Sequence, residues 1–149
     1  MNVAHLHLIT THLPVCGTAL GLGLLLWAAF RRSRELQQTA LGVLVIAALL
    51  ALPAYCSGEP AARFLRSVPG IARETVDRHL EVAQLGLGSV LALGAGALAS
   101  LIAFRKRTTL PAWNLLLLVM LALVSAALLF WTASLGGQVR HPEIRGEQR

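Results

Sequence analysis

Charged residues are scarce in this chain and unevenly placed. Only 13% of the 149 residues are Asp, Glu, Lys or Arg, against about a quarter in a typical soluble domain. They gather in short islands between long apolar runs, and hydrophobic residues make up 56% of the sequence. This pattern is typical of an integral membrane protein and leaves little chain for a second domain. We therefore expect residues 1–149 to form one transmembrane domain.

Several kinds of chemistry lack the residues they need. The two cysteines, Cys16 and Cys56, are too few for a disulfide scaffold and lack the CxxC or CxxCH spacing of redox and covalent haem sites. Two methionines do not provide a Met-rich copper path. No nucleophile motif, phosphate-binding loop or carboxylate pair lies within an apolar run. A subunit or an electron carrier is therefore expected more than a stand-alone enzyme.

Basic residues outnumber acidic ones, and the net charge of +6 comes mostly from arginines that flank the apolar runs. This placement indicates membrane topology and contact with lipid headgroups. No basic stripe is interleaved with aromatic residues, so nucleic acid is not an expected partner. Residues 1–12 contain no Lys or Arg, whereas a secretory signal begins with basic residues. The first apolar run is therefore expected to be a retained span.

The sequence predicts an all-α fold, a four-helix transmembrane bundle. A span needs about twenty apolar residues, and the four predicted spans are residues 8–30, 39–55, 82–104 and 113–135. Pro60 and the helical spacing of apolar residues after it predict a short amphipathic surface helix between spans two and three. The Gly136-Gly137 pair is expected to end the fourth helix. Short loops favour antiparallel pairing of spans one with two and three with four.

Arginine-rich loops predict the orientation in the membrane. Residues 31–38 and 105–112 are short and dense in Arg and Lys, which places them in the cytoplasm by the positive-inside rule. Both termini would then lie on the periplasmic side of a bacterial inner membrane. The predicted aromatic belts are Trp27 and Trp113 on the cytoplasmic side, and Tyr55 and Trp131 on the other.

Small residues predict close helix packing. A ridge in the third span repeats every fourth residue, which lets a neighbouring backbone approach closely, and the first span has a weaker version. The ridge is Gly88, Ala92, Gly96 and Ser100, and the weaker pair is Gly17 and Gly21.

All five histidines fall on the predicted periplasmic side. Ionisable groups within a span are costly, so His12 is a candidate functional residue. A b-type haem in a helix bundle is held by imidazoles from facing helices at matched depth, between apolar walls. His12 and His79 fit this best as axial ligands, because both belong to spans and both are expected to point inward. The expected supporting residues are His5 and His141 as a second pair, and Arg78 and Arg140 beside the haem propionates.

Two alternatives stay open. A copper or zinc site would use a tighter cluster, composed of His5, His7, His12 and Cys16. A cofactor-free accessory subunit would instead pack within a larger membrane assembly. In every case the expected partners are the lipid bilayer and other membrane subunits of a respiratory or redox complex.

Several segments resemble a family of small bacterial four-helix inner-membrane proteins of unknown function. Residues 5–15 match an HLHLxxxHLPV string that includes His5, His7, His12 and Pro14. Residues 53–61 are similar to the family's YxTGEPA stretch, with Cys56 and Ser57 as departures. The segment around His79 resembles a His-Glu motif in which Leu80 replaces the Glu, and residues 136–145 are similar to GGxIRHPEI. The resemblance implies the four-helix fold and, from related families suspected of binding haem, a haem site.

Overall fold

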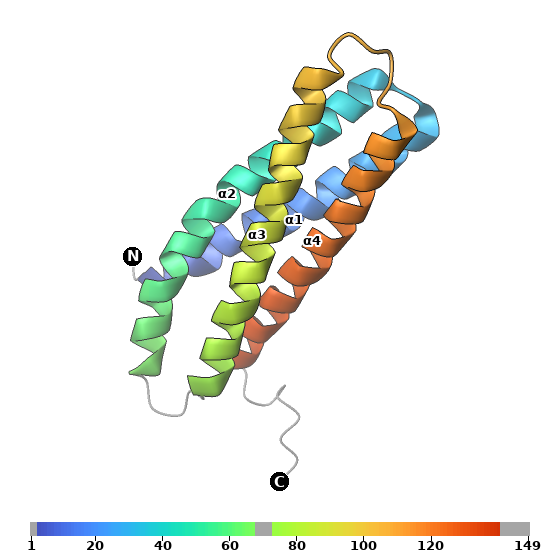
Figure 1. Cartoon of the computed structure of the whole chain (residues 1–149). Helices are drawn as coiled ribbons and strands as arrows, with labels where there is room; N and C mark the ends of the chain where they lie inside the picture. The colour runs from blue at the N-terminus through green and yellow to red at the C-terminus, as the bar shows by residue number, and fades with distance from the viewer. Residues whose placement is uncertain (1–2, 68–72, 141–149) are drawn as a thin grey trace.

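Four long helices make up the protein (Figure 1). The computed structural model describes residues 3–67 and 73–140, which form α1 (Val3–Arg31), α2 (Arg34–Arg66), α3 (Arg73–Ala103) and α4 (Ala112–Arg140). The described residues contain no strand, and each helix is long and apolar enough to cross a membrane. The prediction of an all-α, four-helix transmembrane bundle is therefore confirmed.

Neighbours in sequence are neighbours in space. α1 packs on α2, α2 on α3 and α3 on α4, while α4 returns to pack more sparsely on α1. The predicted pairing of spans one with two and three with four is confirmed. Successive helices run in opposite directions, so the α1–α2 and α3–α4 connections lie together at one end of the bundle (Figure 1). We call the end with residues 31–34 and 104–111 the basic end. The opposite end, where α1 begins and α2 ends, is the histidine end.

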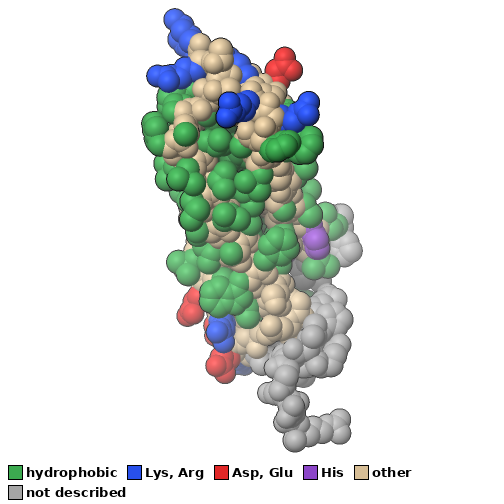
Figure 2. All heavy atoms as spheres, turned by 90° about the vertical axis from the view of Figure 1, so that its right-hand side faces the viewer, with side chains coloured by type: hydrophobic (Ala, Val, Ile, Leu, Met, Phe, Trp, Pro, Cys, Tyr) green, Lys and Arg blue, Asp and Glu red, His purple; other side chains and the backbone are tan. Residues whose placement is uncertain are grey.

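Charge and apolar surface are separated along the bundle. On the face shown in Figure 2, Lys and Arg side chains gather at one end, and a broad hydrophobic band separates them from mixed acidic and basic side chains at the other. Large apolar side chains such as Phe30, Leu85 and Leu116 are at least 60% exposed. In a membrane, lipid would cover this surface.

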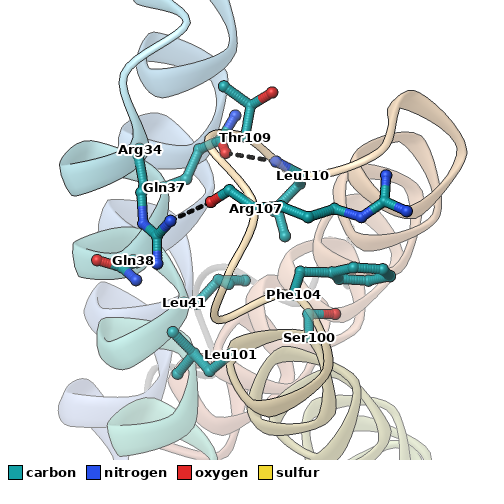
Figure 3. Close-up of a pocket in the computed structure, with 10 residues that line it drawn as sticks. All are labelled: Arg34, Gln37, Gln38, Leu41, Ser100, Leu101, Phe104, Arg107, Thr109 and Leu110. Atoms are coloured by element: carbon teal, nitrogen blue, oxygen red, sulfur yellow. Dashed lines mark hydrogen bonds between the residues drawn. The ribbon is translucent and has the colours of Figure 1, made fainter.

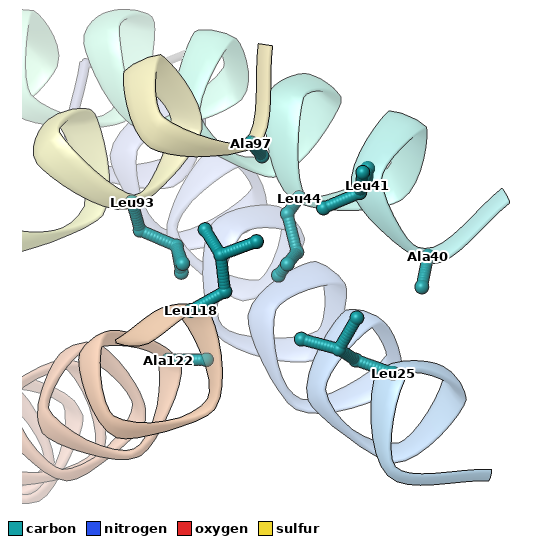
Figure 4. Close-up of a cluster of buried hydrophobic side chains, with 8 residues drawn as sticks. All are labelled: Leu25, Ala40, Leu41, Leu44, Leu93, Ala97, Leu118 and Ala122. Atoms are coloured by element: carbon teal, nitrogen blue, oxygen red, sulfur yellow. The ribbon is translucent and has the colours of Figure 1, made fainter. Parts of the chain in front are cut away.

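A leucine cluster fills the bundle near the basic end. Its central side chains come from all four helices and meet between them (Figure 4). The cluster contains Leu25, Ala40, Leu41, Leu44, Leu93, Ala97, Leu118 and Ala122. This half of the bundle is therefore closely packed around its axis.

Glycines bring two helix pairs close together. A Cβ at Gly17 would lie 2.9 Å from Cβ of Ala47, and one at Gly21 would clash with Leu44, so the weaker predicted pair does pack α1 on α2. Only part of the ridge predicted on α3 contacts a neighbouring helix, because Gly88 faces open space. The closest approach instead involves Gly94, where a Cβ would overlap that of Ala48 on α2.

Two predicted interruptions are wrong. The segment expected to be a separate surface helix forms the last turns of α2, which runs through Pro53 and Pro60 to Arg66. It stays in the bundle because Ala62 packs in a cluster with Val76 of α3 and Val139 of α4. Likewise, α4 continues through Gly136-Gly137 to Arg140.

Candidate functional site

A large cavity lies between the four helices at the histidine end. Its volume is about 500 Å³, and residues of all four helices line it. Many of these residues are small, including Ala51, Ala54 and Ala83, which is why the helices leave space between them. The polar residues on its walls are His7, Thr11, His12, Tyr55, His79 and Thr132.

His7 enters the cavity wall from α1 and is fixed by α2. Its Nδ1 lies 3.0 Å from the carbonyl oxygen of Ala54 and 3.0 Å from the hydroxyl oxygen of Ser57. Gly58 makes room for the ring, because a Cβ there would lie 3.3 Å from Cε1 of His7. A carbonyl oxygen can only accept a hydrogen bond, so Nδ1 carries the proton. Nε2 of His7 is therefore left with a free lone pair.

His79 is fixed in a parallel way by α3 and α4. Its Nδ1 donates to the carbonyl oxygen of Thr132 at 2.9 Å, which again leaves Nε2 with its lone pair. A Cβ at Gly136 would lie 3.2 Å from Cε1 of the ring, so this glycine provides space for the imidazole. The residue after His79 is Leu80, and the orienting role expected of a neighbouring Glu belongs here to a backbone carbonyl.

The two imidazoles lie close together although they come from α1 and α3. Their ring centres are 6.3 Å apart and their planes are 88° from parallel. Metal–nitrogen bonds of about 2.0–2.1 Å place two rings that bind one ion from opposite sides with their centres about 6 Å apart. The separation of His7 and His79 therefore matches that of two imidazoles on a single metal ion. A ligand with a six-membered ring that accepted a hydrogen bond of about 2.8 Å from each imidazole would need the two imidazole centres to lie farther apart.

The other predicted haem residues occupy different places. His12 lines the cavity but is exposed, and its Nδ1 bonds the carbonyl oxygen of Leu8 in its own helix at 2.7 Å. The structure therefore pairs His79 with His7, not with His12. Arg78 is exposed on α3. The side chains of His5 and Arg140, and all of His141, lie outside the described residues.

The predicted metal cluster does not assemble in the described part of the chain. No group of three or more His, Cys, Asp or Glu side chains there could hold a metal ion. Cys16 and Cys56 are both exposed and free. Because His7 of α1 contacts Ala54 and Ser57 of α2, Cys56 lies level with the start of α1, roughly 12 Å along the bundle from Cys16.

Sequence reasoning missed the role of His7 as the partner of His79. A signal was present, since His7, Pro14 and Gly21 recur every seventh residue and therefore share one helix face. Gly21 packs on α2, so that face is the buried one. Tyr55, which was predicted to lie in an aromatic belt, is 37% exposed and also lines the cavity.

A second, much smaller pocket lies at the basic end (Figure 3). Its volume is about 20 Å³, which is room for about one water molecule. Beside it Arg34 donates to the carbonyl oxygens of Arg105 and Arg107, and the Gln37 side chain accepts the backbone N–H of Leu110 at 2.9 Å. These bonds attach the α3–α4 connection to the start of α2. The contacts are structural and leave no space for a cofactor.

The segments that carry the family resemblance meet in the large cavity. The HLHL string supplies His7, the GEPA stretch supplies Gly58 beneath it, and Gly136 of the GGxIRHPEI segment lies against His79. Comparison of the whole chain with protein-family models, curated proteins and solved structures finds no match.

Proposed function

We propose that the protein binds haem b in this cavity and carries electrons within the membrane, with His7 and His79 as the axial ligands. The observation that carries the proposal is the imidazole pair, whose ring centres are 6.3 Å apart. Both rings keep Nε2 available, because both Nδ1 atoms are hydrogen-bonded to backbone carbonyls. Haem-ligating histidines are commonly oriented by such hydrogen bonds on the other ring nitrogen.

The cavity suits the macrocycle as well as the iron. Its volume of about 500 Å³ falls within the range of about 300–1,000 Å³ typical of small-molecule sites. Its walls are mainly Ala, Gly, Val and Leu side chains, which exclude water and accept a flat apolar ring. Haem iron with two axial imidazoles exchanges one electron at a time, and burial and hydrogen bonding tune its potential. The residues described here therefore fit the group.

The residues around the two imidazoles orient them for this proposed role. Ala54 and Ser57 hold His7 in one tautomer, and Thr132 does the same for His79. Rings fixed in this way would hold a haem without having to rearrange. The electron donor and acceptor are proposed to be other components of a respiratory or redox complex in the bacterial inner membrane.

A copper or zinc site is less well supported. Structural zinc takes four protein ligands and catalytic zinc takes three, whereas the described residues bring together only the two imidazoles of His7 and His79.

The test is a reduced-minus-oxidised visible spectrum of the protein purified in mild detergent and supplied with haemin. We expect a sharp α-band that His7→Ala and His79→Ala each abolish. His12→Ala is the matched control, because it removes another cavity imidazole that is not paired with His79, and it should retain the band. A featureless spectrum from folded protein would overturn the proposal. Colourless protein that co-purifies with other membrane subunits would instead indicate a cofactor-free accessory role.

A further inference from the structure

The large cavity has a mouth on the side of the bundle, between α1 and α4. Most lining residues are buried or partly buried, but Leu8 is 50% exposed, Tyr55 is 37% exposed, and His12 and Ala133 are exposed as well. These side chains touch both the cavity and the surface of the protein. Leu8 and His12 lie on α1 and Ala133 on α4, which locates the opening at the seam between these helices; Tyr55 lies on α2 beside the bonds that His7 makes to Ala54 and Ser57.

The face of α1 that carries Leu8 and His12 points away from α2. Gly17, which packs on Ala47 of α2, lies half a helical turn around from Leu8. Across the seam, α4 presents the small residues Ala133 and Gly137, and a Cβ at Gly137 would meet nothing within 4 Å. Nothing in the described part of the chain fills the space at this position.

The seam opens only in this half of the bundle. Near the basic end, Leu25 of α1 and Leu118 of α4 are buried in one cluster. From there α1 and α4 diverge toward the histidine end, where Figure 1 shows the start of α1 well separated from the end of α4. The sparse packing between these two helices agrees with this divergence.

Polar contacts bridge the other three helix pairs at this end. His7 bonds across α1 and α2, and His79 bonds across α3 and α4. Between α2 and α3, Arg66 and Asp77 form an ion pair with an N–O distance of 2.5 Å. The α1–α4 seam is therefore the route of least obstruction between the cavity and the outside.

This mouth lies within the segments that would cross the membrane, His7–Arg31 and Ala112–Val139. We infer that the cavity exchanges its occupant sideways with the bilayer through the α1–α4 mouth, so that its ligand is an apolar ring compound dissolved in lipid. The identity of that ligand as haem b rests on the proposed function, whereas the existence of the mouth does not.

The first test measures lipid access without any haem. The exposed thiols are removed by Cys16→Ser and Cys56→Ser, and a bimane fluorophore is attached at Leu87→Cys, on the cavity wall contributed by α3. In vesicles of brominated phosphatidylcholine the fluorophore should be quenched several-fold more than in unbrominated lipid. Adding Ala133→Phe should relieve the quenching, because the aromatic ring fills the mouth.

Ser134→Phe is the matched control for the plug. It adds the same side chain at the same depth, but position 134 is exposed and does not line the cavity, so quenching should persist. Gly137→Leu is a second plug in case Ala133→Phe fails to fold. An unquenched fluorophore, or equal quenching with both plugs and with the control, would overturn the inference.

A second measurement tests the entry route through the mouth independently of the identity of the ligand. Haem transfer from haem-loaded vesicles should be several-fold slower in Ala133→Phe than in Ser134→Phe, and the final spectrum of Ser134→Phe should match that of the unaltered protein. If no variant takes up haem while the quenching results hold, the haem proposal fails and the mouth stands. Equal uptake rates in the plugged and control variants would contradict entry through the mouth.

Discussion

His7 and His79 lie with their ring centres 6.3 Å apart although 71 residues separate them in the chain. Neither ring is held by its own helix. His7 is fixed by carbonyl and hydroxyl oxygens of α2, and His79 by a carbonyl oxygen of α4. The pair therefore depends on all four helices, and any change in their packing should alter the geometry of the two imidazoles.

Gly136→Ala should disturb His79 while leaving the fold intact. The new Cβ would lie 3.2 Å from Cε1 of the ring, so the imidazole must move by a few tenths of an ångström. We expect weaker haem binding in a spectroscopic titration, with little change in the melting temperature of the apoprotein. Gly137→Ala is the control, since its Cβ would meet nothing within 4 Å. Equal affinities for the two variants would show that His79 does not need this space.

Gly94→Ala should destabilise the bundle. Its Cβ would overlap that of Ala48, and because both atoms are attached directly to helix backbones, α2 and α3 must separate. Such overpacking typically costs about 1–3 kcal/mol, measurable as a lower free energy of unfolding by SDS in mixed micelles. Gly88→Ala, on the same helix but facing open space, should be neutral or up to about 1 kcal/mol more stable, because Ala favours helix. Similar losses for both variants would contradict the observed register of α2 and α3.

Gln37→Leu should loosen the α3–α4 connection at the basic end. The side chain is 4% exposed and is the acceptor for the N–H of Leu110. Leaving this partly buried donor without a partner costs up to about 1–3 kcal/mol, so hydrogen–deuterium exchange at Leu110 should become faster. Gln38→Leu, at the neighbouring exposed position, should leave that exchange unchanged. Unchanged exchange in Gln37→Leu would mean that the arginine contacts alone hold the connection.

Ser125→Ala should be tolerated or stabilising. The Ser125 side chain is fully buried and its hydroxyl has no hydrogen-bond partner, so removing it saves the cost of burying a polar group. Ser100→Ala is the matched comparison: Ser100 is 3% exposed and donates to the carbonyl oxygen of Gly96 at 2.7 Å. Ser100→Ala should lower the free energy of unfolding by about 0.5–1.5 kcal/mol in the same assay. A larger loss for Ser125→Ala would point to a bound internal water molecule.

The pattern of apolar runs correctly predicted four helices. Each helix that crosses the membrane needs about twenty apolar residues, whichever helices it packs against. Helix ends near Pro60 and Gly136 were predicted wrongly. Local propensity favours an interruption at both places, but packing of Ala62 with Val139 and of Gly136 against His79 keeps both helices going.

The site was only partly predictable. The sequence placed five histidines toward one end and made His79 a candidate, but it directed attention to His12 on α1. One residue along a helix rotates a side chain by about 100°, so choosing between His7 and His12 requires the rotation of α1 about its axis. Apolar residues surround α1 on every side, and lipid is as apolar as the bundle interior, so hydrophobicity does not mark the buried face.

By itself, then, the sequence determined the number of spans, their approximate limits and the division into a basic end and a histidine end. Those features depend on the cost of placing charge and unpaired backbone groups in hydrocarbon, which acts on each segment separately. Tertiary structure decided which imidazoles meet, where the cavity opens and which glycines pack. Those outcomes depend on side-chain volumes at the contacts between helices, such as Gly21 against Leu44, and only the assembled bundle brings these volumes together.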